Sequence, residues 1–310
     1  AEAGAIHAVV DALQAFPMDR NVQMLTGCLS SFNDLAPENR PIILRAGGVE
    51  LIMRAKVNHY HDPMVLFRTG CAISATSGDV GVANAIASFR GNGTEFLVQM
   101  MRDHLRSWRV GQEIMQCSRN MMHVDVRHRD ALIRAGFVKA AVDTIREEMH
   151  ERGTPTIGST NLAMLAHKNR TLQDAIMSEG AIELILQAMQ RYFDVDTRGY
   201  GGWTTSDVWP LLPSTLQALW CLARENSDVQ NRLVAAGGLP LIGRIISAYP
   251  QDLRILGYGC ATLGTLTVPN STNLDAAMTL NLPDWCVTHL RGLPSPGLSF
   301  DGLEAHIGRF

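Results

Sequence analysis

The sequence predicts an all-α solenoid built from repeated units of three helices. A glycine-centred phrase recurs along the chain, its glycines are almost evenly spaced, and apolar residues recur at helical intervals between them. The phrase reads NRPIILRAGGVELIMRA from Asn39 and HRDALIRAGFVKAAVDT from His128, with shorter versions from Ser178 and Ala235. One such unit cannot bury its apolar face alone, so each copy gives the next a surface to pack against.

The spacing of the recurring glycines sets the repeat length. These glycines are Gly4, Gly47, Gly93, Gly136, Gly180 and Gly237. The first four intervals are 43, 46, 43 and 44 residues, a period typical of helical solenoids. The last interval is 57 residues, so one repeat carries an insertion.

We therefore expect one repeat array over residues 1–291 and a C-terminal tail over 292–310. The expected repeats are 1–37 (partial), 38–79, 80–125, 126–167, 168–224 with an insertion at 192–213, 225–268, and 269–291 (partial). Because the chain begins with Ala and the first repeat lacks its opening helix, we expect further sequence upstream.

The second repeat shows the signals for its three helices. Pro41 can open a short first helix, and Gly47 breaks it where a left-handed residue or a close backbone approach is needed. The second helix then starts near Val49. Asp62 is a suitable N-cap and Pro63 suits the first helical position, so they predict the start of the third helix.

The phrases that begin and end each repeat are similar to those of the armadillo repeat. SEGAIELILQAM resembles the family phrase EAGAIPALV, whereas ALWCLAREN and LAMLAHKNR resemble ALSNLA. The resemblance spans roughly residues 1 to 290 and implies a right-handed superhelix whose third helices line a concave, protein-binding groove. HEAT repeats, the alternative, have a similar length but lack the glycine-centred break between the first two helices.

The resemblance also implies positions for peptide-binding residues. Peptide-binding armadillo proteins place Asn on successive third helices, where its amide pairs with a peptide backbone. The corresponding positions are Phe32, Ala75, Asn120, Met164, Cys221, and Leu263 or Thr265. Only Asn120 matches, and the companion Trp is replaced by Gln116 and, two repeats later, by Gln217. Regular peptide capture is therefore doubtful, and these three residues are candidates for binding a different partner.

The insertion at 192–213 is the second candidate binding region. It contains Tyr192, Phe193, Tyr200, Trp203 and Trp209 in a stretch rich in Gly and polar residues. Aromatic side chains on such a loop are typical interface anchors. The alternative is a loop that folds back on its own repeat.

Other patterns argue against catalysis and cofactors. Cys28, Cys71, Cys117 and Cys260 share a place in third helices, so we expect buried, reduced core thiols. The histidine pair His59 and His61 has no completing ligands nearby, and we find no metal motif, cofactor motif or Ser-His-Asp arrangement. A net charge of -3 and a pI of 6.4 give no footprint for nucleic acid. No apolar run is long enough to insert into a membrane.

These observations predict a non-catalytic scaffold that binds other proteins as a structural or adaptor subunit of a stable complex. An intracellular location is expected, in the cytoplasm or in the cytoskeleton or a cilium, with the nucleus as the alternative. The competing hypothesis is a regulatory armadillo module of an enzyme that binds a nucleotide metabolite or a peptide in its groove. A basic pocket near Arg106, Arg109 and Arg119 would favour that hypothesis.

Overall fold

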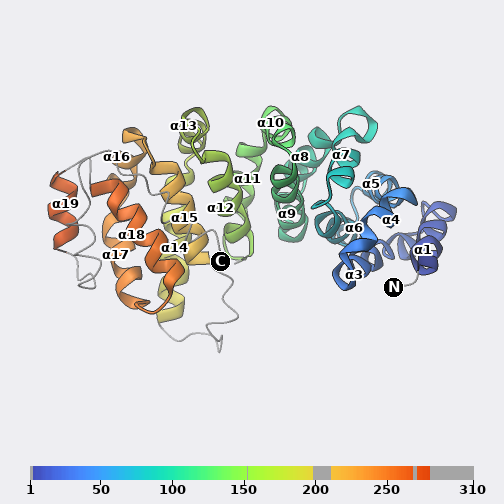
Figure 1. Ribbon diagram of the computed structural model, residues 1–310, viewed down its shortest axis with the longest axis horizontal. Coiled ribbons are helices and arrows are strands. Elements are labelled where there is room, and N and C mark those ends of the chain that lie inside the picture. Colours follow the sequence, from blue (N-terminus) through green and yellow to red (C-terminus); the bar gives the residue numbers. More distant parts are fainter. Residues whose placement is uncertain (1–2, 152, 198–210, 268–270, 280–310) are drawn as a thin grey trace. The chain divides into compact units, whose positions relative to one another are not determined.

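The chain is all-α in the part that the structure describes. This computed structural model describes residues 3–151, 153–197, 211–267 and 271–279, where every regular element is a helix (Figure 1). The predicted fold class is therefore confirmed. The chain divides into two units, Ala1–Glu148 and Met149–Phe310, and this boundary falls inside the range predicted as the fourth repeat.

The helices follow the order short first helix, second helix, third helix. The first unit contains α1 (Ala3–Ala15), α2 (Arg20–Gln23), α3 (Thr26–Leu35), η1 (Pro37–Asn39), α4 (Arg40–Arg45), α5 (Gly48–Asn58), α6 (Pro63–Thr76), α7 (Val80–Ser88), η2 (Phe89–Gly91), α8 (Gly93–Asp103), α9 (Trp108–Val124), α10 (Val126–Arg134) and α11 (Phe137–Glu147). The second contains α12 (Gly153–Ala166), α13 (Arg170–Ser178), α14 (Ala181–Thr197), α15 (Leu211–Ala223), α16 (Ser227–Ala235), α17 (Gly238–Ala248), α18 (Leu253–Thr267) and α19 (Ser271–Met278).

Acidic and amide N-caps begin the first helices of four repeats. The capping residues are Asp79, Asp125, Asn169 and Asn226, and each side chain accepts a hydrogen bond from a backbone N–H in the first turn of its helix. Such caps satisfy backbone donors that the helix itself leaves unpaired. The predicted cap of α6 is also present, since Asp62 Oδ1 accepts from Met64 N and Val65 N.

Glycines end the first helices in the left-handed conformation. Gly47, Gly136, Gly180 and Gly237 have φ between 77° and 82°, where a side chain would be strained. The third repeat differs from the prediction, because Gly91 (φ 79°) and not Gly93 adopts this conformation.

Gly93 meets a different requirement, which is space. It is the first residue of α8, where a Cβ would lie 1.9 Å from the Ile86 carbonyl oxygen. Gly48 occupies the corresponding place in the second repeat, and a Cβ there would lie 2.9 Å from Ile43 Cγ2. The break between the first two helices thus uses one glycine for backbone conformation and another for close packing.

Third helices pack against one another within each unit. In the first unit α6 lies between α3 and α9, and in the second α15 lies between α12 and α18. In Figure 1 the first helices α7 and α10 lie along the upper edge of the first unit, with α3, α6 and α9 below them. This stacking places the outward residues of α3, α6 and α9 on one continuous surface.

Buried amides tie first helices to the end of the preceding third helix. Each amide donates to the carbonyl seven residues earlier: Asn39 to Phe32 (2.7 Å), Gln173 to Ala166 (3.3 Å), Gln230 to Ala223 (2.9 Å) and Asn273 to Leu266 (2.9 Å). All four side chains are buried. Three of these carbonyls also accept a backbone N–H, Phe32 from Ala36, Ala166 from Asn169 and Ala223 from Asn226. The amides therefore add a second bond that links the end of each third helix to the start of the next repeat.

Two predictions were wrong, one about the burial of cysteines and one about the start of the insertion. Cys117 and Cys260 are buried as predicted, but Cys28 and Cys71 are half-exposed, because their helix positions face outward from the stack. Tyr192 and Phe193 lie in α14 and not in an insertion loop. Phe193 follows Met189 by four residues, so it continues the buried face of α14 and packs near the Tyr249 ring, 6.2 Å between centroids.

Candidate functional site

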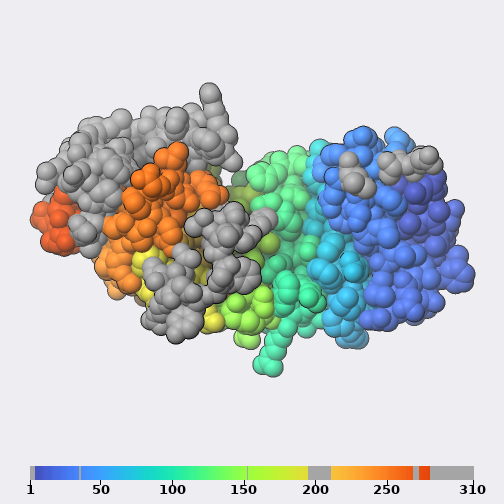
Figure 2. Space-filling view, turned by 90° about the horizontal axis from the view of Figure 1, so that it is seen from below, coloured from blue at the N-terminus to red at the C-terminus, as the bar shows by residue number. Residues whose placement is uncertain are grey.

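The candidate site is the outward surface of α3, α6 and α9, which we call the third-helix face. Its defining residues are Cys28, Phe67, Arg68, Cys71, Trp108, Arg109, Gln116 and Asn120. All are half-buried or exposed, although they belong to helices whose other sides form the core. Figure 2 shows the first unit as a continuous surface, coloured from blue at α1 to green toward α11.

Gln116 and Asn120 form a hydrogen-bonded pair on α9. Gln116 Nε2 donates to Asn120 Oδ1 at 3.2 Å, and Asn120 Nδ2 donates to the Ser74 carbonyl on α6 at 2.8 Å. The predicted Asn120 therefore joins two third helices through its amide. A partner that used this amide would have to share or displace the Ser74 bond.

A second asparagine joins third helices one repeat earlier. Asn33 Nδ2 donates to the Ala75 carbonyl at 3.0 Å, and its side-chain oxygen accepts from Arg40 Nε at 2.6 Å. Alignment placed Phe32 at this position, one residue away. Asn33 is buried, so it stabilises the stack and offers no amide to a partner.

The remaining predicted binding residues lie elsewhere. Gln217 is half-buried on α15 in the second unit. Tyr200, Trp203 and Trp209 fall outside the described residues, so their predicted binding role stays a prediction.

An arginine–aromatic cluster on the third-helix face was not predicted. It consists of Phe67, Arg68, Trp108 and Arg109. The Arg109 guanidinium carbon lies 5.2 Å from the Phe67 ring centroid and 4.9 Å from that of Trp108. The Arg68 guanidinium carbon lies 5.8 Å from the same Phe67 ring. Cation–π attraction of this kind holds charged side chains in place at the surface.

The two arginines of the cluster carry no carboxylate partner within the described residues. Glu113 follows Arg109 by four residues, the usual spacing for an ion pair on a helix. Its carboxylate instead accepts from Ser74 Oγ at 2.5 Å and from Cys71 Sγ at 3.5 Å. Among the described residues, neither of these two guanidinium groups is therefore balanced by an ion pair.

Glu113 reaches α6 because Gly70 leaves room for it. A Cβ on Gly70 would lie 2.7 Å from Glu113 Cβ and 3.9 Å from Lys56 Nζ. Lys56 is fully buried, and its amine donates to the Leu66 carbonyl at 3.3 Å. Desolvation by burial lowers the pKa of Lys56 to about 8, while Cys117 and Glu113 oppose the shift. The amine is therefore mainly charged at neutral pH and balances the negative charge of Glu113.

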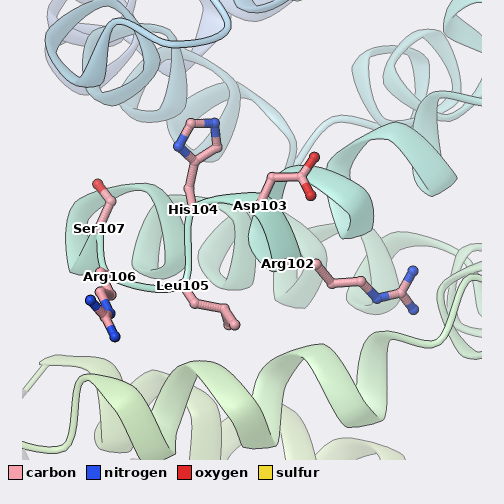
Figure 3. A pocket seen from close by; sticks show the side chains of 6 residues that line it. All are labelled: Arg102, Asp103, His104, Leu105, Arg106 and Ser107. Carbon is pink, nitrogen blue, oxygen red and sulfur yellow. The ribbon is translucent and has the colours of Figure 1, made fainter.

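A surface cavity of about 420 Å³ lies at the loop between α8 and α9. Residues 102–107 line it. Arg102, Leu105 and Arg106 point to one side, and Asp103, His104 and Ser107 point to the other (Figure 3). Arg102 Nη2 already donates to the Ala135 carbonyl at 2.8 Å, so this arginine closes the end of α10.

The basic pocket that would favour a nucleotide ligand is not assembled at this cavity. Arg106 lines it, but Arg109 and Arg119 do not. Arg106 Nε lies 4.0 Å from Glu147 Oε2, whereas Arg109 lies against Phe67 and Trp108. This cavity therefore adds no support to the regulatory-module hypothesis, which stays a prediction.

Two other kinds of site are absent from the described residues. No three His, Cys, Asp or Glu side chains come close enough there to hold a metal ion. Nor does any helix in that part of the chain have the length and apolar character required to cross a bilayer.

Comparison with known proteins identifies the fold. No protein-family model matches the chain, and no curated protein matches it in sequence. Among solved structures, the designed armadillo repeat protein YIII(Dq)4CqI is 15% identical and superposes with a TM-score of 0.65, covering 84% of this chain and 100% of its own. A designed armadillo repeat protein in complex with peptide (KR)4 is 16% identical, with a TM-score of 0.64 and coverage of 84% and 99%.

The chain therefore has an armadillo-like repeat fold, as its glycine-centred phrases predicted. An engineered protein gives a similar result, with a TM-score of 0.67, 15% identity and coverage of 84% and 98%. Since identities this low show the fold alone, the function must be argued from this chain's own surfaces.

Proposed function

We propose that the chain is a non-catalytic scaffold that binds a segment of another protein across its third-helix face. The observation that carries this proposal is the arginine–aromatic cluster, which places two guanidinium groups on the surface beside two half-buried rings. Neither guanidinium forms an ion pair with a carboxylate of the described residues. Arginine and large aromatic residues are the types most enriched at interface hot spots. The similarity to a designed armadillo protein in complex with a peptide supports the same kind of surface.

Photo-crosslinking tests which surface binds. A photo-reactive amino acid at Ser31 on α3 or at Ala75 on α6 would report from the third-helix face. Control positions are the exposed Arg45 and Arg134 on first helices of the same unit. We expect a defined partner to crosslink from Ser31 and Ala75 and not from the controls. Equal crosslinking from both sets would contradict the proposal.

We further propose that the protein is a subunit of a stable intracellular complex, with a cytoskeletal or ciliary assembly as the first specific hypothesis. Sequence reasoning alone supports this part. A fluorescent fusion at the native locus tests it. Diffuse signal and a monomeric native mass would contradict membership in such an assembly.

A further inference from the structure

We propose that the segment bound by the third-helix face is acidic, with Asp or Glu side chains paired to Arg68 and Arg109. This inference rests on the proposed function and names the chemistry of the partner. It depends on three features of the first unit: where the two guanidinium groups are held, what lies beside them, and what balances the carboxylate of Glu113.

The two guanidinium groups are held at one place. Arg68 from α6 and Arg109 from α9 approach the same Phe67 ring, with carbon-to-centroid distances of 5.8 and 5.2 Å. The stem of Arg68 also rests on α3, because a Cβ on Gly27 would lie 3.1 Å from Arg68 Cδ. Side chains already held in position lose less conformational entropy on binding.

The charge of the pair is not neutralised locally. Glu113 is the nearest acidic residue along α9, but it is bound to Ser74 and lies close to the buried, positively charged Lys56. Lys56 has no exposed surface, so its positive charge balances the negative charge of Glu113 from inside the protein. The outer surface therefore keeps the positive charge of both arginines.

Carboxylates fit this arrangement best. A guanidinium group binds a carboxylate through two parallel hydrogen bonds, and the aromatic rings beside it exclude water from the pair. Nucleic acid is a less suitable ligand, because the chain has a net charge of -3 and the cluster contains just two basic residues.

A peptide-display selection tests the inference with the full chain. Random twelve-residue peptides are selected against the wild-type protein and against Arg68→Glu/Arg109→Glu. The matched control is Arg45→Glu/Arg134→Glu, which changes the net charge equally on first helices. A further variant, Arg68→Lys/Arg109→Lys, keeps the charge but loses the paired geometry. Circular dichroism checks that each variant is folded.

We expect acidic peptides to be enriched on the wild-type protein. Their Kd should rise at least tenfold in the Arg68→Glu/Arg109→Glu variant, by an intermediate factor in the lysine variant, and less than threefold in the control. Enrichment of neutral or basic peptides would overturn the inference and leave the proposed function standing. So would equal weakening by the control, or binding of a single-stranded oligonucleotide through Arg68 and Arg109. Enrichment of no peptide would overturn both.

Discussion

At two successive contacts between third helices, a glycine makes room for a charged side chain of the next helix, and the two side chains have opposite charges. We call the contact of α3 with α6 the first junction and that of α6 with α9 the second. The sequence Thr-Gly-Cys occurs in α3 at 26–28 and again in α6 at 69–71. At the first junction Gly27 receives the stem of Arg68, whose charged end stays exposed. At the second, Gly70 receives Glu113, which is hydrogen-bonded and lies close to a buried lysine. The repeated glycine therefore marks where two third helices meet, whereas the side chain that packs against it is an exposed arginine at the first junction and a hydrogen-bonded glutamate at the second.

Removing Glu113 should have the largest effect on stability. Glu113→Ala loses the hydrogen bond from Ser74, worth about 1.5 kcal/mol for a charged acceptor. It also leaves Lys56 without its counter-charge. Because the pKa of Lys56 is about 8, losing the proton at pH 7 costs roughly a further 1.4 kcal/mol at most. We expect a total loss of about 1.5 to 3 kcal/mol in urea unfolding.

The comparable change at the first junction is Arg68→Ala, and it should cost less than about 0.5 kcal/mol because Arg68 is exposed. Similar losses for the two variants would show that the two junctions do not differ as described.

Replacing the glycine at each junction with alanine should have different effects on stability at the two junctions. Gly70→Ala places a methyl group 2.7 Å from Glu113 Cβ, which cannot move without moving α9, so we expect a loss of about 1 kcal/mol. Gly27→Ala meets only the flexible side chain of Arg68, with Cδ at 3.1 Å and Nη1 at 3.7 Å, and it improves helix propensity. The stability of this variant should therefore be unchanged or raised by up to about 1 kcal/mol. Thermal unfolding measures both, and a loss in Gly27→Ala equal to that in Gly70→Ala would contradict this difference.

Lys56 should give the second junction a distinctive pH dependence. Its pKa is lowered from 10.5 in the unfolded chain to about 8 in the fold. Between these values the unfolded state binds more protons, so this group makes stability rise with pH. From pH 7 to 9 the wild type should gain about 1 kcal/mol relative to Lys56→Met, which cannot titrate. A constant difference between the two proteins in urea unfolding would refute the lowered pKa.

The smallest expected effect concerns thiol reactivity and not stability. Cys28 and Cys71 occupy the same repeat position and are both half-exposed. Burial, followed by the charge of Glu113, raises the pKa of Cys71 to about 12, and its thiol also donates to Glu113. Pulsed alkylation with mass spectrometry should therefore label Cys28 before Cys71, and buried Cys117 last. The variant Glu113→Ala should accelerate Cys71. Equal rates for Cys28 and Cys71 would argue against this effect of Glu113.

The sequence predicted features that depend on local backbone requirements. Asp62 with Pro63 marked the start of α6, and Gly47, Gly136, Gly180 and Gly237 marked the ends of first helices, because capping and left-handed backbone restrict residue choice. The exception was the third repeat, where two glycines two residues apart serve different purposes and even spacing selected Gly93.

The features that the sequence did not predict depend on how each helix is rotated against its neighbour. Cys28 and Cys71 recur like core residues, yet the stacking turns them outward. Lys56 reads as an ordinary surface lysine, and only the packing of α5 against α6 buries it. The arginine–aromatic cluster brings together Phe67 and Arg109, which are 42 positions apart, so no local pattern indicates it.

The buried amides have a consequence for where the chain can be cut. Asn39, directly before α4, and Gln173, Gln230 and Asn273, inside the next first helix, each donate to a carbonyl near the end of a third helix. A shortened protein that stops at the end of a third helix would therefore lose the buried hydrogen bond that this amide makes, although it contains only whole repeats. Shortened versions that keep the following first helix should stay folded. The modular unit for engineering therefore begins at a second helix and ends with the first helix of the next repeat.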